Sequence, residues 1–249
     1  MKKVLIIIPA YNESENIERV VDHIVTNYPM YDYVVVNDGS RDDTRDICRR
    51  RGYNYLNLSI NLGIGGAVQT GYKYARDFGY EAAVQIDGDG QHDIHYLEKM
   101  LDFMKEKEAD IVIGSRFIEK EGFQSSTARR TGIVILSTLV YLCTGCRVKD
   151  ITSGFRLVNK KFIHIYAENY PNDYPEPEAI VSAVMHGAKI LEYPVIMKER
   201  LCGKSSINFV KSVYYMIKVT LAIVICRISF GFRRDPEVKK NQKRKKDER

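Results

Sequence analysis

The feature that most constrains the fold of this chain is the alternation of short apolar runs with longer amphipathic segments over residues 3–115. Residues 3–8 read as one strand with an unbroken apolar run from Val4, closed by Pro9, which is typical of a strand buried on both faces. Residues 12–28 carry apolar side chains at helical spacing, and Asn12 or Ser14 can cap that helix. Further strands are expected at 33–36, 53–58, 82–86 and 110–113, with helices at 42–51, up to about 78 and from about 93. Such alternation predicts right-handed βαβ units and an α/β fold with a mostly parallel sheet flanked by helices.

Polar motifs follow four of these expected strands at the point where each strand ends. They are Tyr11–Glu13, Asp38–Ser40, Asn61–Gly66 and Asp87–Gln91. In open sheets of this type, ligands bind at the carboxyl ends of the strands. We therefore expect the four motifs to lie close together and to form one site.

Asp87 and Asp89 are the residues in these motifs that point most directly to chemistry. They follow a hydrophobic strand, and Gly88 and Gly90 permit a tight backbone beside them. Carboxylates are hard oxygen ligands suited to Mg²⁺ or Mn²⁺, and open positions on the ion can accept phosphate oxygens. A single Asp-x-Asp is a weak signal, because acidic turns are common. Its position at a strand end among other polar loops favours a metal site.

Seven motifs in this order resemble those of family 2 glycosyltransferases. They are Ile8–Glu13, Asn37–Ser40 with Asp43 and Thr44, Asn61–Gly66, Asp87–Asp89, Gly114–Arg116, Asp150–Arg156 and Arg200–Ser206. The resemblance covers residues 3 to about 210 and implies the GT-A (Rossmann-like) fold. The later motifs are similar to the branch that includes dolichyl-phosphate mannose synthases and polyprenyl-phosphate glycosyltransferases. They say little about which sugar is transferred.

The resemblance also implies roles for individual residues. The nucleotide-sugar would be bound by Pro9, Tyr11, Glu13, Asp38, Gly66, Asp87 and Lys204, and the metal ion, Mg²⁺ or Mn²⁺, by Asp87, Asp89 and Gln91. Asp89, Arg116 and Arg200 would be catalytic. The alternative is that the nucleotide-binding candidates are only structural: a proline that ends a strand, a residue that caps a helix and an aspartate in a turn.

A lipid phosphate acceptor carries negative charge and needs cationic side chains, for which arginine is well suited. By the resemblance, that phosphate would be received by Arg116, Arg129 or Arg130, and Ser205. A solvated helix face is the alternative for Arg129 and Arg130. A phosphate monoester, whose second pKa is about 6, is already ionised near neutral pH and needs no general base. A sugar hydroxyl does need one.

Relatives that act on hydroxyl groups often have a Glu-Asp pair where this chain reads Tyr-Pro-Glu-Pro-Glu at 174–178. We therefore expect metal-dependent, inverting transfer of a hexose from a UDP- or GDP-sugar to a polyprenyl phosphate. The alternative is a transferase acting on a sugar hydroxyl in cell-wall or surface polysaccharide assembly, with Glu176 or Glu178 as its base. A catalytically silent membrane adaptor is the third hypothesis, and the intact Asp-x-Asp weighs against it.

Two segments of the second half, 131–146 and 207–232, are strongly apolar and expected to be helical. The first is shorter than the roughly twenty residues that a membrane span requires, and Lys211, Lys218 and Arg227 interrupt the second. A buried core helix is one interpretation of each, and an interfacial helix in the headgroup layer is the other. We expect a catalytic domain at 1–206, an amphipathic membrane-associated helix at 207–232 and a basic disordered tail at 233–249.

The net charge of +6 is concentrated at the C-terminal end. Residues 233–249 hold nine Lys or Arg against four Asp or Glu, which gives +5 and leaves about +1 for the rest of the chain. A basic tail suits anionic lipid headgroups, and the remaining chain lacks the basic surface that nucleic-acid binding needs.

The expected location is cytoplasmic, peripheral to the inner face of the cell membrane. The five cysteines form no disulfide-like framework, and the N-terminal apolar run is too short for a signal peptide. The expected partners are a nucleotide-sugar, a polyprenyl phosphate and the membrane surface. A small membrane protein could also supply the spans that some relatives carry.

Overall fold

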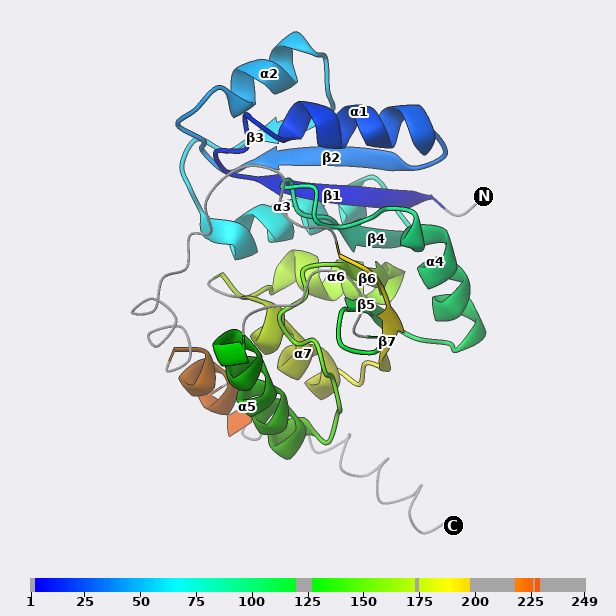
Figure 1. Cartoon of the computed structure of the whole chain (residues 1–249), viewed down its shortest axis with the longest axis vertical. Helices are drawn as coiled ribbons and strands as arrows, with labels where there is room; N and C mark the ends of the chain where they lie inside the picture. The colour runs from blue at the N-terminus through cyan, green and yellow to red at the C-terminus, as the bar shows by residue number, and fades with distance from the viewer. Residues whose placement is uncertain (1–2, 120–126, 173–174, 198–217, 226, 229–249) are drawn as a thin grey trace.

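The computed structural model describes residues 3–119, 127–172, 175–197, 218–225 and 227–228, and it is built on a seven-stranded sheet with the order β3-β2-β1-β4-β6-β5-β7 (Figure 1). The strands are β1 (Val4–Ala10), β2 (Asp32–Asn37), β3 (Tyr55–Asn57), β4 (Ala82–Gln85), β5 (Ile111–Ser115), β6 (Arg156–Asn159) and β7 (Ile190–Pro194). The helices with assigned bounds are α1 (Ile17–Asn27), α2 (Thr44–Arg50), α3 (Gly63–Asp77), α4 (Tyr96–Glu106), α5 (Thr127–Thr144), α6 (Lys160–Glu168) and α7 (Pro175–Met185).

The sheet is mixed, because β6 runs antiparallel to both of its neighbours. Arg156 of β6 pairs with Gln85 of β4 on one side and with Ile113 of β5 on the other. The remaining pairs are parallel, so the expectation of a mostly parallel sheet is confirmed. As a consequence, β6 begins at the sheet edge where β1, β2, β4 and β5 end.

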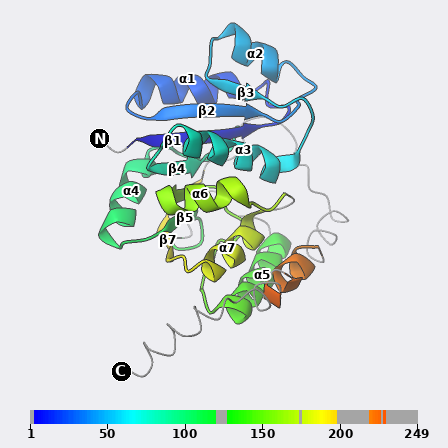
Figure 2. The same cartoon turned by 180° about the vertical axis from the view of Figure 1, so that it is seen from behind.

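Side chains of β1 alternate between two hydrophobic cores, one on each face of the sheet. Leu5 and Ile7 face the core that also receives α3, α5, α6 and α7, whereas Ile6 and Ile8 face the core under α1, α2 and α4. All four side chains are fully buried, as the unbroken apolar run predicted. Figure 2 shows α3 and α6 in front of the sheet, on the face opposite α1.

The starts of α1 and α3 differ from the expectation for reasons that the hydrogen bonds show. The predicted helix at 12–28 begins only at Ile17, because the Glu13 carbonyl accepts hydrogen bonds from the N–H groups of Asn16 and Ile17 and closes a turn there. The expected turn at Asn61–Gly66 is instead largely the first turn of α3, which starts at Gly63. At that end the Leu62 N–H donates to Asp38 Oδ1 from the loop after β2, and the Gly63 N–H donates to Oδ1 of the nearby Asn61. Two N–H groups at the start of the helix, which have no partner within it, thus find acceptors.

Helix α5 confirms the helix expected at 131–146 and starts four residues earlier. Residues 218–225 and 227–228, called here the C-terminal helical segment, are helical and lie beside α5 (Figure 1). Arg227 Nε donates a hydrogen bond to the Cys143 carbonyl at 2.7 Å, and the buried Val219 and Ile223 join the α5 core. Within the described ranges, none of the helices has the length and apolarity needed to cross a bilayer. The expected domain limits at 206 and 232, and the tail at 233–249, lie outside the described residues and stay predictions.

Candidate active site

The loops after β1, β2 and β3 are joined by hydrogen bonds between backbone and side chains. The Asn12 N–H donates to Ser40 Oγ at 3.0 Å, and the Leu62 N–H donates to Asp38 Oδ1 at 2.7 Å. The Glu13 N–H donates to Thr44 Oγ1 at 2.9 Å. The motifs that were expected to converge at the carboxyl edge of the sheet do converge there.

Asp38 lies at the centre of this network and is almost completely buried. Burial raises the pKa of its carboxyl group, and hydrogen bonds from the N–H groups of Leu62 and Gly63 partly oppose that rise. Tyr11, by contrast, is 42% exposed and follows Ala10, whose carbonyl accepts the Asp38 N–H. An aromatic ring next to a carboxylate acceptor can bind a nucleoside by stacking and hydrogen bonding, which is the role that the resemblance implied for these two residues.

Asp87 and Asp89 follow β4 in the neighbouring turn. The side chain of Asp87 is about one-third exposed, whereas Asp89 is buried and its Oδ1 accepts the Gln91 N–H at 3.0 Å. The turn packs closely on the end of β1: a Cβ placed on Gly88 would lie 3.2 Å from the Pro9 carbonyl oxygen and 3.5 Å from Glu13 Cγ. The predicted donor residues Pro9, Glu13 and Asp87 are therefore neighbours in space.

The residues of this turn fit a divalent cation that takes most of its ligands from the phosphates of a bound substrate. In the part of the chain that the structure describes, no cluster of three or more His, Cys, Asp or Glu side chains could hold a metal ion by itself. Two carboxylates and the Gln91 amide supply the hard oxygen ligands that Mg²⁺ and Mn²⁺ accept, and such ions commonly complete their coordination with phosphate oxygens and water.

Arg116 follows β5 at the same edge of the sheet and forms a buried ion pair with Asp150. Its Nε and Nη2 donate to Asp150 Oδ2 and Oδ1 at 2.7 and 2.6 Å, and its backbone N–H donates to Oδ2 at 3.0 Å. Arg116 Nη2 also reaches Thr152 Oγ1 at 3.1 Å. The structure thus fixes the orientation of a guanidinium that was expected to meet the acceptor phosphate, and much of its donor capacity already serves a carboxylate.

Asp150 and Glu192 are structural residues of this site to which sequence reasoning assigned no role. Asp150 is fully buried, and Glu192 of β7 accepts the N–H groups of Lys149 and Asp150 at 2.9 and 2.8 Å. Asp150 stood within a motif of the resemblance, so the signal for it was present. Glu192 offered none, because its partner lies 42 positions away in the sequence.

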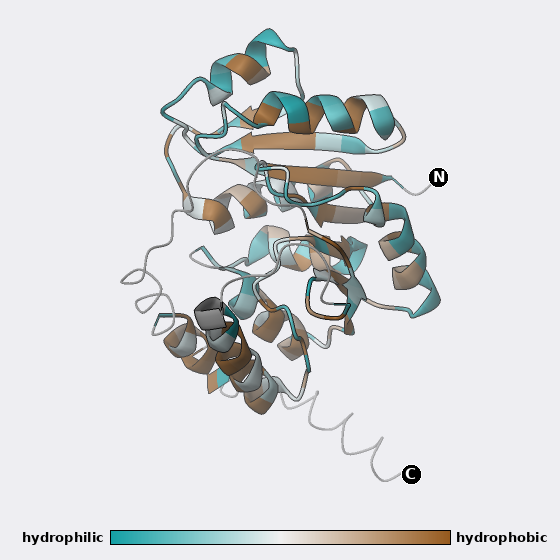
Figure 3. Cartoon of the chain, in the orientation of Figure 1, coloured by the Kyte–Doolittle hydropathy of each residue, from teal (hydrophilic) through white to brown (hydrophobic). Residues whose placement is uncertain are grey.

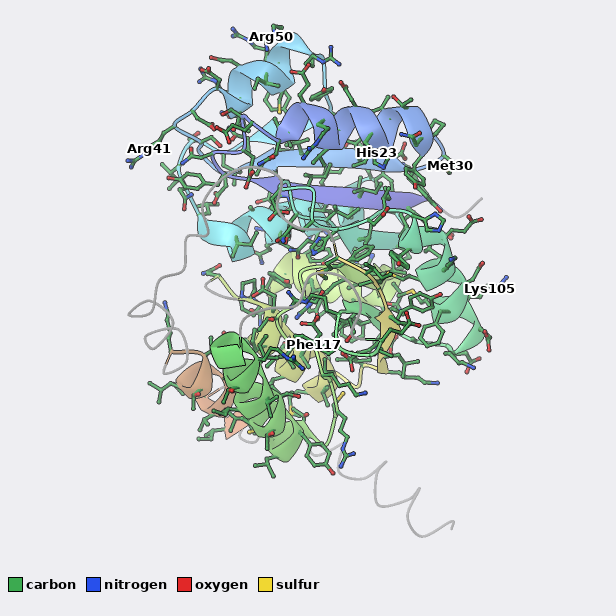
Figure 4. The ribbon with its side chains drawn as sticks, in the orientation of Figure 1. His23, Met30, Arg41, Arg50, Lys105 and Phe117 are labelled. Atoms are coloured by element: carbon green, nitrogen blue, oxygen red, sulfur yellow. The ribbon has the colours of Figure 1, made fainter. Side chains whose placement is uncertain are left out.

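A cavity of about 250 Å³ lies between the end of β5 and α5. It is lined by Phe117, Arg130, Ile133, Val134, Ser137, Thr138 and Lys149. Figure 4 shows Phe117 near α5, one residue beyond Arg116. Of the predicted acceptor residues, Arg130 is thus placed beside an apolar cavity, and the structure adds Lys149. Arg200, Lys204, Ser205 and the side chain of Arg129 lie outside the described residues.

Arg156 and the start of α7 border the site on the side of β6. Arg156 is buried, and its guanidinium donates to the carbonyl oxygens of Ser153, Ile151 and Glu176 at 2.7–2.9 Å. It joins two backbone segments, which is a structural role. Glu178, in the first turn of α7, is half-buried, and burial raises the pKa of its carboxyl group.

Comparisons with known proteins agree with this arrangement. A family model for glycosyl transferase family 2 matches residues 5–165. The UDP-N-acetylglucosamine–dolichyl-phosphate N-acetylglucosaminyltransferase of Methanococcus voltae is 30% identical over 214 residues, covering 78% of this chain and 85% of that protein. The polyprenol monophosphomannose synthase of Mycolicibacterium smegmatis is 27% identical over 220 residues, covering 83% and 82%.

Among solved structures, glucosyl-3-phosphoglycerate synthase from Mycobacterium tuberculosis, in complex with Mn²⁺, uridine diphosphate and phosphoglyceric acid, matches with a TM-score of 0.67. The match has 16% identity and covers 91% of this chain and 78% of that one, which identifies the fold as GT-A. The family match spans well over half of the chain and includes the loops that build the site. The chain therefore belongs to glycosyl transferase family 2 and is a glycosyltransferase.

Proposed function

We propose that the protein transfers a hexose from a UDP- or GDP-sugar to a polyprenyl phosphate at the cytoplasmic face of the membrane, with Mg²⁺ or Mn²⁺ and with inversion at the sugar. The observation that carries this proposal is the cavity between β5 and α5. It combines two cations, Arg130 and Lys149, with an apolar wall formed by Phe117, Ile133 and Val134. A lipid phosphate is complementary to this lining, because its phosphate is negatively charged and its chain is hydrocarbon.

The donor half of the proposal rests on the converged loops. In this proposal Asp38 and Tyr11 bind the nucleoside, and Asp87 and Asp89 bind a cation on the diphosphate. The cation would neutralise charge that develops on the leaving diphosphate. Relatives of the same fold have been crystallised with UDP and either Mn²⁺ or Mg²⁺, which supports a divalent ion for this chain.

The acceptor half is supported by an exposed apolar surface next to the cavity, called here the apolar surface. It comprises Val134, Ile135, Tyr141 and Leu142 of α5 and Leu221, Val224, Ile225 and Ile228 of the C-terminal helical segment. Figure 3 shows that hydrophobic residues dominate both elements. An apolar surface of this kind, beside Arg130 and Lys149, suits shallow insertion into the headgroup layer of a bilayer.

The expected chemistry needs no general base, because an acceptor phosphate is already charged near neutral pH. The protein then has to position the two substrates and stabilise the charge on the leaving group. Gly154 approaches Asp87, while Asp150, four residues earlier, binds Arg116. One short segment thus connects the donor and acceptor halves.

A second candidate is transfer to a hydroxyl group. The specific observation in its favour is Glu178, which lies half-buried in the first turn of α7, where the Glu176 carbonyl accepts a hydrogen bond from Arg156 at the start of β6. Burial raises the pKa of its carboxyl group, which suits a general base. This candidate predicts that Glu178→Gln abolishes transfer, whereas the phosphate acceptor predicts nearly normal turnover for that variant.

The test is an acceptor assay with the full chain. Purified protein with Mn²⁺ is incubated with radiolabelled UDP-glucose, UDP-N-acetylglucosamine or GDP-mannose, each with polyprenyl phosphate or with a saccharide acceptor. We expect label in the organic phase with polyprenyl phosphate only. A product formed only with the saccharide would contradict the lipid acceptor, and an anomeric assignment of the product by NMR decides between inversion and retention.

A further inference from the structure

The carboxylate of Asp87 has a buried side chain beside each of its two oxygens. Gln85, the last residue of β4, is 1% exposed and its Nε2 donates to Asp87 Oδ1 at 3.2 Å. The His92 side chain is 3% exposed, and its Nε2 lies 3.7 Å from Asp87 Oδ2. Both oxygens of one carboxylate therefore face a nitrogen of a fixed neighbour.

The hydrogen bonds of His92 determine which of its nitrogens carries the proton. Its Nδ1 accepts the backbone N–H of Asp87 at 3.0 Å, so the proton of the neutral ring is on Nε2, on the side of Oδ2. The ring is stacked on the fully buried Phe155, with centroids 5.2 Å apart and planes at 18°. His92 thus accepts a hydrogen bond from the Asp87 backbone and lies close to the Asp87 carboxylate, and its own orientation is fixed by packing.

Gly154 closes the third side of the carboxylate. A Cβ at this position would lie 3.0 and 3.2 Å from the two Asp87 oxygens and 2.9 Å from Gln85 Nε2. Any side chain there would have to displace the carboxylate or the amide. The start of β6, which only the antiparallel insertion brings to this edge, is therefore in direct contact with the expected metal ligand.

We propose that Gln85 and His92 are positioning residues that hold the Asp87 carboxylate in the one orientation in which it accepts the divalent cation. This inference rests on the proposed metal-dependent function. A carboxylate that can rotate about its χ torsions must be ordered when the cation binds, which weakens binding, whereas one held by outer neighbours is already ordered. Loss of such an outer contact typically lowers metal affinity by roughly 10- to 100-fold.

The experiment measures Mn²⁺ binding to the full chain by electron paramagnetic resonance, with Mn²⁺ alone and with UDP or GDP added. Gln85→Met removes the donor at nearly constant volume, and His92→Phe keeps the stacking on Phe155 while removing both nitrogens. We expect each to raise the Mn²⁺ Kd by about 10-fold or more. His92→Asn, which keeps an acceptor for the Asp87 N–H, should fall between His92→Phe and the wild type.

Matched control variants are Gln69→Met and His95→Phe. Gln69 Nε2 donates to the Ala167 carbonyl of α6, and His95 lies exposed at the start of α4. Both should bind Mn²⁺ with a Kd within twofold of the wild type. A purely structural role for Gln85 and His92 would lower the urea midpoint of the variants and leave the Mn²⁺ Kd of the folded fraction unchanged.

Folded Gln85→Met and His92→Phe proteins with wild-type Mn²⁺ affinity would overturn the inference and leave the proposed function intact. A wild-type protein that binds no Mn²⁺ or Mg²⁺ with either nucleotide would instead contradict the proposed metal-dependent function, and the inference with it. If His92→Phe does not fold, the Mn²⁺ affinities of His92→Asn and Gly154→Ala test the inference instead. Gly154→Ala should also weaken Mn²⁺ binding, because the new methyl group presses on the same carboxylate.

Discussion

Arg116 and Asp150 form a two-point ion pair, with N–O distances of 2.6 and 2.7 Å, in which the carboxylate is completely buried. The Arg116 backbone N–H binds the same carboxylate, so Asp150 fixes both the loop after β5 and the side chain that follows it. The position of the expected acceptor arginine therefore depends on a residue 34 positions away.

Asp150→Ala should destabilise the fold strongly, because it removes the carboxylate partner of a buried guanidinium. The expected loss is about 3–5 kcal/mol in the free energy of unfolding, measured by urea denaturation. Arg116→Met combined with Asp150→Leu should be less destabilised than Asp150→Ala, since no buried charge is left without its counter-ion. Equal losses in the single and double variants would show that the ion pair is not what holds the loop.

Asp38→Ala should cost about 1–3 kcal/mol, because the Leu62 N–H loses its acceptor in a part-buried hydrogen bond. Asp38→Asn keeps an acceptor oxygen and should cost less. The measurement is the free energy of unfolding from urea titrations near neutral pH. Donor binding by a thermal-shift assay should fall in both variants if this side chain also binds the nucleoside.

The stability of the Asp38→Asn variant relative to the wild type should depend on pH. The pKa of Asp38 is raised in the folded state, so the folded protein binds the proton more tightly than the unfolded chain. The wild type therefore loses stability as the pH rises from the ordinary Asp pKa of about 3.9 through the raised value, and the asparagine variant does not share this loss. Between the ordinary and the raised pKa of Asp38, the free energy of unfolding of Asp38→Asn should therefore rise relative to that of the wild type. Above the raised pKa, the difference should no longer change with pH.

Removal of the metal should abolish transfer without unfolding the protein. Treatment with EDTA, or the substitution Asp89→Ala, should lower kcat by roughly 1,000-fold, which corresponds to about 4 kcal/mol of lost charge stabilisation on the leaving diphosphate. Added Mn²⁺ or Mg²⁺ should restore the EDTA-treated enzyme and leave Asp89→Ala inactive. Full activity of Asp89→Ala would show that Asp89 is not needed for transfer and that the turn does not act through a metal ion.

Binding to liposomes should depend on the apolar surface. Leu142→Glu and Ile225→Glu each remove one large exposed apolar side chain, and each should weaken sedimentation with anionic liposomes by about tenfold or more. Val25→Glu on α1 is the control, since it changes an exposed apolar residue on the opposite side of the sheet. If all three variants pellet like the wild type, the apolar surface is not the membrane contact.

Much of the site was predictable from local patterns in the sequence. The unbroken run Val4–Ile8 predicted a strand buried on both faces, and strand–helix alternation predicted that the four polar motifs would meet at one edge. These conclusions depend only on side-chain periodicity and on the geometry of parallel strands, which nearby residues determine. Boundaries were less accurate at Ile17, where a turn closed by the Glu13 carbonyl precedes the helix, and at Gly63, where Asp38 from another loop accepts the Leu62 N–H.

The tertiary structure alone decided the contacts that set the orientation of the functional groups. The insertion of β6 antiparallel between β4 and β5 brings Gly154 against Asp87 and Asp150 against Arg116, and neither pairing leaves a periodic signal in the sequence. Likewise, no local pattern in the sequence links His92 to Asp87, and only the tertiary structure shows its hydrogen bond to the Asp87 backbone and its stacking on Phe155. The sequence determined which chemical groups are present and at which edge they lie. Long-range packing determined how each is held, because the partners lie on strands whose order the chain's local pattern does not specify.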